Sequence, residues 1–523
     1  MRLEDLLLGA GYDFFRESDS DDNIPKNSTL RFGNKSQNDL KNIEIRNITE
    51  SSRDVREGDI FVCIAGLHAD GHDFIDTACQ RGAALIVADK SREKDVYCDA
   101  PIMFVDNTRV ALSNLFASFY ANPQKALKII GITGTNGKTT TARMLYEILK
   151  KYGLRCGLIG TTGSISPSGR LDIRSLDECA NMTTPEPAEL YKILSVMRGD
   201  GAEYVVMEVS SHSLTQGRVE PIEFCVALFS NLTRDHLDFH GDMESYFLAK
   251  SKLFYKCKKA IINIDDMYGR RLAESIVSPI KCSAEGREAQ YMATEIKYRG
   301  ESGVEYKLSS RLSNLRVRAS IPGKFTVYNS LLAISCALEI GVPSSIIRYA
   351  MMSLAGSDGR IERVDIGNAP FSVFIDYAHT PDALENLLLC ARSFKNRKSR
   401  IVLLFGCGGD RDRDKRKIMG SIASSLADFV IITSDNPRSE DREKIIFDIL
   451  LGVDKESRYT VIPDREAAIK YAIANARAGD IILLAGKGHE KYEIADGKKV
   501  YFNEREIVER DYIERLEGKN KEG

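Results

Sequence analysis

One glycine- and threonine-rich loop is the segment best equipped for chemistry. The apolar run KIIGIT (128–133) is followed by GTNGKTT and then by a helical pattern; the loop residues are Gly134, Thr135, Asn136, Gly137, Lys138, Thr139 and Thr140. Glycines let backbone N–H groups surround a polyphosphate, a helix start adds positive potential, Lys138 supplies a charge and the Thr139 hydroxyl can join a Mg²⁺ shell. We therefore predict nucleotide phosphate binding. A plain glycine turn is the alternative, and Ile132 occupies the position of the first glycine in the general phosphate-loop pattern.

Two other segments combine acidic, hydroxyl and imidazole groups. Glu208 ends the apolar run EYVVMEVS, where a carboxylate is suited to hold a Mg²⁺ ion that bridges phosphate oxygens. A strand-capping acid is the alternative. Another apolar run, VALFS, is followed by Asp235, His236, Asp238 and His240. These side chains fit a second metal or a site facing a nucleophile, and a solvated polar loop is the alternative.

Lys250 stands on the apolar stripe of a predicted helix. Met243, Phe247 and Phe254 share that stripe by i, i+3 and i+4 spacing. A lysine there is costly unless it has a function or extends to solvent. Lys250 is therefore a candidate functional residue.

The segment IITSDNPR ends an apolar run in Asp435, Asn436, Pro437 and Arg438. Turn chemistry explains the Asp, Asn and Pro, each of which favours turns, but does not explain Arg438. The nearby segment FGCGGDRDRDKR contains glycines after a strand, yet the GxGxxG register of a dinucleotide loop is absent. No NAD site is predicted.

The elements that must position these residues alternate between apolar strands and helical patterns. This alternation indicates an α/β protein with mostly parallel sheets and helices on both faces. We place domain boundaries so that residues 1–122, 123–355 and 356–523 form three domains. In the last of these, strands are predicted within FSVFIDYAHT, RIVLLFGCGG, DFVIITSDNPR and DIILLAGKGHE, and ligands of such sheets bind outside the strands' carboxyl ends.

Composition excludes several classes of protein. The chain of 523 residues has a net charge of −2, which favours neither nucleic acid nor an anionic membrane. Its start lacks the pattern of a signal peptide, and no apolar run approaches the roughly 20 residues needed to span a bilayer. The 11 cysteines are scattered without a CxxC pair, which argues against a disulfide framework and a zinc site. We expect a cytoplasmic location.

The loop GTNGKTT resembles the phosphate loop of the Mur ligases, the ATP-dependent amino-acid-adding enzymes of peptidoglycan synthesis; folylpolyglutamate synthetases carry a close variant. Further resemblance extends from about residue 50 to 505 through NMTTPE, SSHSLTQGR, GKFTVYNS, GSDGRIERV, IDYAHTPDAL and DNPR. Within the family the chain is similar to the tripeptide synthetases. The resemblance implies an N-terminal UDP-substrate domain, a central ATP-binding domain with a parallel sheet like that of P-loop ATPases, and a Rossmann-like C-terminal domain.

The resemblance also implies roles for individual residues. Catalysis would involve Lys138, Glu208, His236 and Lys250. Two Mg²⁺ ions would be held by Thr139, Glu208, His236 and a carbamylated Lys250. ATP would contact the phosphate loop, Asn329 (adenine), Arg360 (phosphates), Asp376 (ribose), Tyr377 and His379. The UDP-sugar-peptide would contact Ser52, the backbone of Leu67, His68 and Ala69, and Thr183, Thr184, Ser210, Gln216 and Arg218. The incoming amino acid would contact Arg411, Asp435, Asn436, Arg438, Gly486 and Glu490.

The implied reaction is the ATP-dependent addition of meso-2,6-diaminopimelate to UDP-N-acetylmuramoyl-L-alanyl-D-glutamate through an acyl phosphate. DNPR resembles the motif of the diaminopimelate-adding enzymes, in which the arginine pairs with the distal carboxylate. The alternatives within this chemistry are lysine, lanthionine or glutamate (the last as on folate) as the added amino acid. A regulatory ATP-binding protein without activity is another, although Lys138, Glu208, His236 and Lys250 are all present. We expect a monomer that binds small-molecule substrates and closes its C-terminal domain before chemistry. We also expect it to support cell shape and division.

Overall fold

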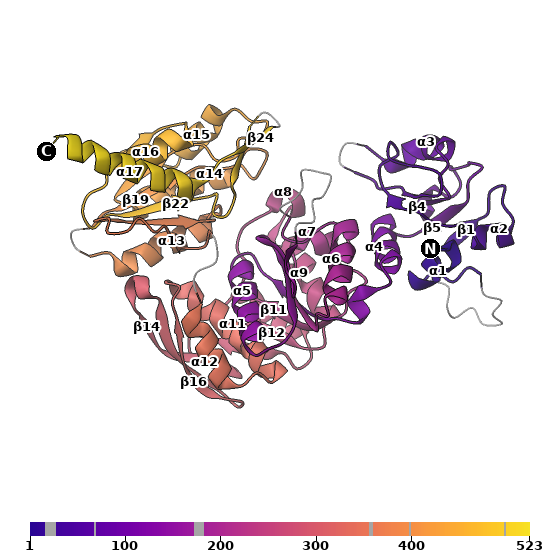
Figure 1. Ribbon diagram of the computed structural model, residues 1–523, viewed down its shortest axis with the longest axis horizontal. Coiled ribbons are helices and arrows are strands. Elements are labelled where there is room, and N and C mark those ends of the chain that lie inside the picture. Colours follow the sequence, from indigo (N-terminus) through magenta and orange to yellow (C-terminus); the bar gives the residue numbers. More distant parts are fainter. Residues whose placement is uncertain are drawn as a thin grey trace. The chain divides into compact units, whose positions relative to one another are not determined.

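The computed structural model of the protein describes residues 1–15, 28–66, 69–171, 182–354, 359–396, 399–495 and 498–522 (Figure 1). Two compact units are present: residues 1–131, 155–225 and 256–258 form the first, and residues 132–154, 226–255 and 259–523 form the second. Leu67 and His68, to which the family resemblance assigns substrate contacts, lie outside the described residues.

The first unit begins with a five-stranded sheet in the order β1 (Thr29–Arg31), β5 (Ile102–Val105), β4 (Leu85–Asp89), β3 (Ile60–Val62), β2 (Ile48–Thr49). β1 pairs antiparallel and the other pairs are parallel. β3 and β4 are almost entirely buried, as expected for strands in which apolar residues do not alternate with polar ones. The strands predicted within 58–66 and 82–89 are thus confirmed. The accompanying helices are α1 (Leu3–Gly9), α2 (Gln37–Lys41), α3 (Ile75–Gln80) and α4 (Thr108–Phe119).

A second set of strands in this unit carries Glu208. β10 (Tyr204–Glu208) pairs parallel with β7 (Cys156–Gly160), and β8 (Gly163–Ser166) and β9 (Gly169–Leu171) continue from β7 antiparallel. The helix α6 (Pro187–Gly199) begins with a proline at a position where the missing N–H costs nothing. The short helix α7 (Ser211–Thr215) follows β10, so Glu208 lies at the junction between a buried strand and a helix.

The first part of the second unit surrounds the phosphate loop. β6 (Lys128–Thr133), whose bounds match the predicted strand, leads through the loop into α5 (Lys138–Lys151). β11 (Phe224–Phe229), β12 (Ala260–Asn263), β13 (Ile280–Ser283) and β14 (Tyr291–Tyr298) pair parallel in sequence, and β15 (Val304–Ser310) and β16 (Asn314–Ala319) extend them antiparallel. The helices are α8 (Leu237–His240), α9 (Met243–Ser251), α10 (Met267–Ser275), α11 (Lys324–Ile340) and α12 (Ser344–Ser353).

The rest of the second unit is a six-stranded sheet. Its order is β17 (Glu362–Arg363), β18 (Ser372–Asp376), β22 (Ile481–Ala485), β19 (Ile401–Phe405), β20 (Phe429–Ile432), β21 (Tyr459–Val461), and only β17 is antiparallel. Separate apolar cores cover its two faces, so helices flank the sheet on both sides (Figure 1). The strands predicted in this region are confirmed as β18, β19, β20 and β22.

The helices of this sheet are α13 (Pro381–Phe394), α14 (Asp414–Leu426), α15 (Arg442–Leu450), α16 (Arg465–Ala474) and α17 (Glu504–Glu522), and β23 (Tyr492–Ala495) and β24 (Lys498–Tyr501) form a separate hairpin. Within the part of the chain that the structure describes, no helix combines the length and apolar character needed to cross a membrane.

Candidate active site

The phosphate loop closes tightly between β6 and α5. A Cβ atom at Gly134 would lie 1.9 Å from the Ser230 hydroxyl oxygen, and one at Gly137 would lie 2.3 Å from Asn329 Oδ1. Both glycines also have positive φ angles, +147° and +87°, that side chains disfavour. The N–H of Asn136 donates to Asn231 Oδ1 at 2.9 Å. Backbone geometry therefore requires the glycines that the motif contains.

Two cations converge on the start of α5. The Lys138 amine donates to the backbone oxygens of Gly134 and Thr135, each at 2.9 Å, so it lies over the loop that precedes it. Arg360 donates to the Thr139 hydroxyl at 3.5 Å. A polyphosphate in the loop would meet positive charge from both side chains in addition to the helix N-terminus.

A mainly apolar cavity of about 100 Å³ adjoins this loop. Six of the residues assigned to ATP line it: Asn136, Gly137, Thr140, Asn329, Arg360 and Asp376. Ile321, Phe325 and Leu387 supply apolar surface suited to a flat base. The Asp376 carboxylate is fixed by the N–H groups of Ile361 (2.7 Å) and Ala378 (2.8 Å). The cavity has the composition expected of a nucleoside site, with polar groups at few points.

Lys250 does not extend to solvent. Its side chain is 2% exposed, and its amine donates to the Gly134 oxygen at 2.9 Å and lies 4.6 Å from the centre of the Tyr246 ring. Burial, with the charge of Lys138 adding to it, holds the pKa of Lys250 well below its usual value. Phe247 and Phe254 are also buried, but α9 ends at Ser251. The predicted stripe is thus present, and its lysine lies against the phosphate loop.

His236 lies where α8 begins, with a left-handed backbone (φ +53°). Its Nε2 atom is 3.3 Å from Oδ2 of the buried Asp235. Burial alone would raise the pKa of Asp235, but His236, His379 and other nearby cations outweigh it and the pKa lies below its usual value. Among the residues that the structure describes, no three His, Cys, Asp or Glu side chains converge as a metal site.

A second cavity, of about 170 Å³, collects every residue assigned to the incoming amino acid: Arg411, Asp435, Asn436, Arg438, Gly486 and Glu490. These residues follow the carboxyl ends of β19, β20 and β22. Tyr377 and His379, which the resemblance assigns to the nucleotide, follow β18 and line this second cavity. Asp235 and His236, in the loop after β11, and Asp238, in α8, also line it. Parallel strands place their following loops at one edge of the sheet, which explains why the residues after β18, β19, β20 and β22 lie together.

The Asn436 amide is held at both ends. Its oxygen accepts from Lys487 Nζ and from the N–H of Ile494, each at 3.0 Å, and its nitrogen donates to Glu490 Oε2 at 2.8 Å. The Asp435 carboxylate is 6% exposed and packs 3.1 Å from the position of a Cβ at Gly486. Burial raises the pKa of Glu490, and Asp435 adds to that effect. Two acidic groups thus share one wall of the cavity in fixed positions.

Arg438 faces the same cavity from a strained backbone position (φ +54°). Its N–H donates to the Ile494 oxygen at 3.0 Å and its guanidinium donates to the Gly409 oxygen at 2.7 Å. Burial lowers the pKa of Arg438, and the charge of Arg411 adds to this. An anion between the two arginines would relieve their repulsion.

Five of the residues assigned to the sugar-peptide substrate, Thr183, Thr184, Ser210, Gln216 and Arg218, lie in the same part of the first unit as Glu208. The Glu208 carboxylate accepts from the N–H and the hydroxyl of Thr161, each at 3.0 Å, and the Thr183 hydroxyl is 3.0 Å from that of Thr161. The Thr184 hydroxyl donates to the Glu208 backbone oxygen at 2.9 Å.

Three further members of this group, Ser210, Gln216 and Arg218, flank α7. Ser210 caps that helix, and the Arg218 guanidinium donates to the Thr184 oxygen at 2.9 Å and to Gln216 Oε1 at 2.5 Å. Arg218 also pairs with Glu186 at 2.6 Å. Ser52 lies in the turn between β2 and β3.

His379 predicts a pH dependence of stability. Burial, reinforced by Lys415, lowers its pKa from 6.5 to about 4. Between these values the unfolded chain binds a proton that the folded protein does not, so the free energy of unfolding falls as the pH falls. We expect wild type to lose stability relative to His379→Gln across this window in urea denaturation of the ligand-free protein. Well above it the two should show the same pH dependence, and equal slopes within it would refute this role.

Comparison with known proteins identifies the family. Three family models match the chain: the Mur ligase family catalytic domain at residues 44–120, the Mur ligase middle domain at 132–337 and the Mur ligase glutamate ligase domain at 359–488. The chain is also 41% identical over 485 residues to a UDP-N-acetylmuramoyl-L-alanyl-D-glutamate–2,6-diaminopimelate ligase of Syntrophomonas wolfei, covering 91% of this chain and 96% of the relative. The chain belongs to the Mur ligase family.

Other relatives of this Mur ligase agree. A protein of the same name from Clostridium acetobutylicum is 43% identical over 468 residues, covering 89% of this chain and 94% of the relative. A solved structure of a 2,6-diaminopimelate ligase of this kind matches with a TM-score of 0.61 and 31% identity, covering 90% of this chain and 95% of the other. The solved structure of MurF ligase from Thermotoga maritima in complex with ADP shares the fold. It matches with 20% identity and a TM-score of 0.59, covering 91% of this chain and 98% of the other.

Three buried cations of this Mur ligase were not singled out from the sequence. Lys415 lines the second cavity, Lys487 holds Asn436, and Arg416 lies beneath the loop after β19. Lys415 and Arg416 occur within a run of charged residues that would ordinarily mark a solvated helix start. Nothing in the neighbouring sequence indicates that these two cations are buried. Lys487 could have been noticed, because it closely follows an apolar strand, much as Lys138 does.

Proposed function

We propose that this Mur ligase joins meso-2,6-diaminopimelate to UDP-N-acetylmuramoyl-L-alanyl-D-glutamate at the expense of ATP, in the synthesis of peptidoglycan precursors. The observation that carries the proposal is the second cavity. It presents the guanidinium groups of Arg411 and Arg438 together with the carboxylates of Asp435 and Glu490. An amino acid with two carboxylates and two amines complements this arrangement of charges. The names of the relatives at 41% and 43% identity support the same substrate.

The reaction would proceed in two steps. The glutamate side-chain carboxylate attacks the γ-phosphorus of ATP, ADP leaves and an acyl phosphate forms. The free amine of the amino acid then attacks the carbonyl carbon, a tetrahedral intermediate collapses, phosphate leaves and the amide remains after loss of a proton. Lys138 and Arg360 would neutralise the charge that develops on the transferred phosphoryl group. Asp435 and Glu490 would hold an ammonium group of the amino acid while its other amine reacts.

Two Mg²⁺ ions would reduce repulsion between the phosphates and the attacking carboxylate. Thr139, Glu208, His236 and Lys250 would hold them. The described residues offer no cluster of three His, Cys, Asp or Glu ligands, so these donors fit only if phosphate oxygens complete the shell. A carbamylated Lys250 would add carboxylate-like oxygens, and its buried amine, which favours the neutral form that reacts with CO₂, suits that modification.

We further propose that residues 1–122, 123–355 and 356–523 act as domains for the UDP-substrate, ATP and the amino acid, respectively. The C-terminal domain would close before chemistry, because groups from different domains must meet at the reacting atoms. The enzyme would work as a cytoplasmic monomer on small molecules, without nucleic acid or membrane insertion.

Phosphate release measured with each candidate amino acid tests the proposal. With ATP, Mg²⁺ and UDP-N-acetylmuramoyl-L-alanyl-D-glutamate, we expect meso-diaminopimelate to support turnover and L-lysine to give a kcat/KM lower by about 100-fold or more. Arg438→Ala should lower kcat/KM for diaminopimelate by about 100-fold while changing that for lysine little. Lanthionine serves as a probe that retains the distal carboxylate. Equal turnover of lysine and diaminopimelate by the wild type would reject the proposal.

A further inference from the structure

We infer that Arg416 and Glu440 are a positioning pair that fixes the place of Arg438 and so sets the preference for an amino acid with a distal carboxylate. This inference rests on the proposed function and adds a residue pair that does not line the amino-acid cavity. The pair lies where the loop after β19 (residues 406–413) is joined to the loop after β20 (residues 434–440). We call these two loops the specificity loops.

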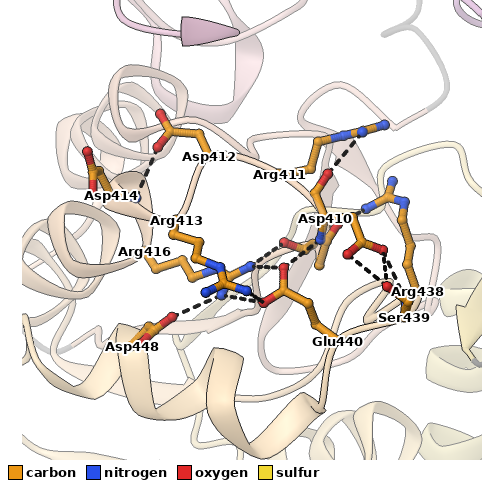
Figure 2. Close-up of polar contacts among 12 residues, drawn as sticks. Asp410, Arg411, Asp412, Arg413, Asp414, Arg416, Arg438, Ser439, Glu440 and Asp448 are labelled. Carbon is orange, nitrogen blue, oxygen red and sulfur yellow. Dashed lines mark hydrogen bonds and ion pairs between the residues drawn. The ribbon is translucent and has the colours of Figure 1, made fainter. Parts of the chain in front are cut away.

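Arg416 is a fully buried cation at the base of the specificity loops. Its side chain is 1% exposed, and its guanidinium donates to both carboxylate oxygens of Glu440, at 2.8 and 3.0 Å (Figure 2). It also donates to Asp448 at 2.9 Å and to the Gly408 oxygen at 3.3 Å. A two-pronged contact of this kind fixes direction as well as distance. Arg416 therefore connects α14 and α15 with both specificity loops.

Glu440 carries this constraint into the loop after β19. Its Oε1 atom accepts from the N–H of Asp410 at 2.6 Å, and its Oε2 atom lies 3.3 Å from the Arg413 guanidinium. The hydrogen bonds from Arg416 lower the pKa of Glu440 to about 2, so the carboxylate stays charged at neutral pH. Figure 2 shows Glu440 between the Arg416 guanidinium and the Asp410 backbone. Loss of its charge would loosen both contacts.

The specificity loops are joined again directly around Arg438. The N–H of Gly409 donates to the Asn436 oxygen at 2.9 Å, and Arg438 donates back to the Gly409 oxygen at 2.7 Å. The Asp410 carboxylate accepts from the Ser439 N–H at 3.1 Å and from its hydroxyl at 2.8 Å (Figure 2). A Cβ atom at Gly409 would lie 1.9 Å from the Pro437 oxygen, so the loops approach as closely as backbones allow.

Two residues of the specificity loops have strained backbone conformations, which the contacts described above would stabilise. Asp410 and Arg438 both adopt left-handed backbone angles, φ +52° and +54°, which cost free energy for residues with a side chain. Arg438 lines the cavity from this conformation. Arg416 and Glu440, whose side chains are 1% and 12% exposed, contact the loop after β19 at the Gly408 oxygen and the Asp410 N–H. Arg438 donates to the neighbouring Gly409 oxygen, so the pair is placed to hold both strained residues.

If the pair had a purely structural role, its loss would destabilise the protein without changing amino-acid selectivity. A control pair distinguishes a structural role from a role in selectivity. Asp480 is 1% exposed and accepts from the Arg400 guanidinium at 2.6 Å in the same sheet region, but neither residue lines either cavity. Glu440→Gln and Asp480→Asn each remove the carboxylate charge from an ion pair that has one buried member, with little change of shape. Ser439→Ala removes a loop contact at an exposed position and is a second variant that should fold.

The readout is the ratio of kcat/KM for meso-diaminopimelate to that for L-lysine, with thermal unfolding measured beside it. We expect Glu440→Gln to lower this ratio by about tenfold, mainly through KM for diaminopimelate, with KM for ATP unchanged. Ser439→Ala should lower it by about threefold, since a neutral hydrogen bond is worth less. Asp480→Asn should lower Tm but leave the ratio within about twofold of wild type.

An unchanged ratio in both Glu440→Gln and Ser439→Ala, or an equal change in Asp480→Asn, would overturn the inference while leaving the proposed function intact. If Glu440→Gln does not fold, the ratio in Ser439→Ala decides alone. A wild-type enzyme that turns over lysine as well as diaminopimelate would reject the proposed function itself, and the inference with it.

Discussion

Lys138→Met is expected to lower kcat by about 10³-fold, with the protein still folded. The Lys138 amine lies over the phosphate loop and donates to the Gly134 and Thr135 backbone oxygens. Backbone oxygens are weaker partners for a cation than a phosphate is, so the amine should turn to ATP when it binds. Because the charge on the phosphoryl group grows during transfer, loss of the amine should raise the barrier more than it weakens ATP binding. Phosphate release and fluorescent-nucleotide titration measure the two effects.

A lysine on the same helix provides the control for Lys138. Lys150 is exposed near the end of α5, and Lys150→Met removes the same charge and the same atoms. We expect its kcat to remain within about twofold of wild type, as for an ordinary surface substitution. A Lys138→Met enzyme that retained more than about a tenth of the wild-type kcat would show that the loop lysine does not stabilise the transferred phosphoryl group.

Lys250→Ala is expected to lower kcat by about 10³-fold and to regain part of it when acetate or bicarbonate is added. The reason is that a small carboxylate could enter the space left by the shortened side chain and supply the oxygens that a carbamate would have placed there. The side chain is buried against the Gly134 oxygen and the Tyr246 ring, so the space is enclosed. The measurement is phosphate release over a series of acetate concentrations.

Two controls make the Lys250 experiment decisive. Intact-mass spectrometry of the gently handled wild type should show the added mass of one carbamate, absent from Lys250→Ala. Lys250→Arg keeps a positive charge but does not form a stable carbamate, so its kcat should fall as far as that of the alanine variant. Unchanged activity in Lys250→Ala would remove carbamylation from the mechanism, and loss without any rescue would limit Lys250 to packing.

Local sequence patterns were sufficient to predict most strands and the phosphate loop. KIIGIT became β6 with the expected bounds because an uninterrupted apolar run followed by glycine has few other stable structures. The residues assigned to the incoming amino acid come from loops far apart in the chain. The sequence could predict that they lie together only because parallel strands bring their carboxyl ends to one edge of a sheet. The position of Lys250 against Gly134 was not predictable, since spacing along a helix says nothing about what its apolar face contacts.

Other features needed the three-dimensional structure for a different reason. Arg416 and Lys487 are buried by contacts with residues more than twenty positions away, Glu440 and Asn436. A charged residue whose partner lies in another loop has no local pattern that separates it from a solvated one. The assignment of Tyr377 and His379 to the nucleotide rested on resemblance alone and stays a prediction, and both side chains line the second cavity, beside Arg411 and Arg438.

The close approach of Gly409 to the Pro437 oxygen has a consequence for how this enzyme could acquire a new substrate. Two loops that share backbone hydrogen bonds and leave no room for a Cβ atom cannot be exchanged separately, because each is shaped to the other. A donor sequence from a lysine-adding relative would have to supply both segments, together with residues matching Arg416 and Glu440, as a single graft. Natural changes of amino-acid preference would then be inherited as one block, whereas the phosphate loop, which belongs to a different sheet, could stay as it is.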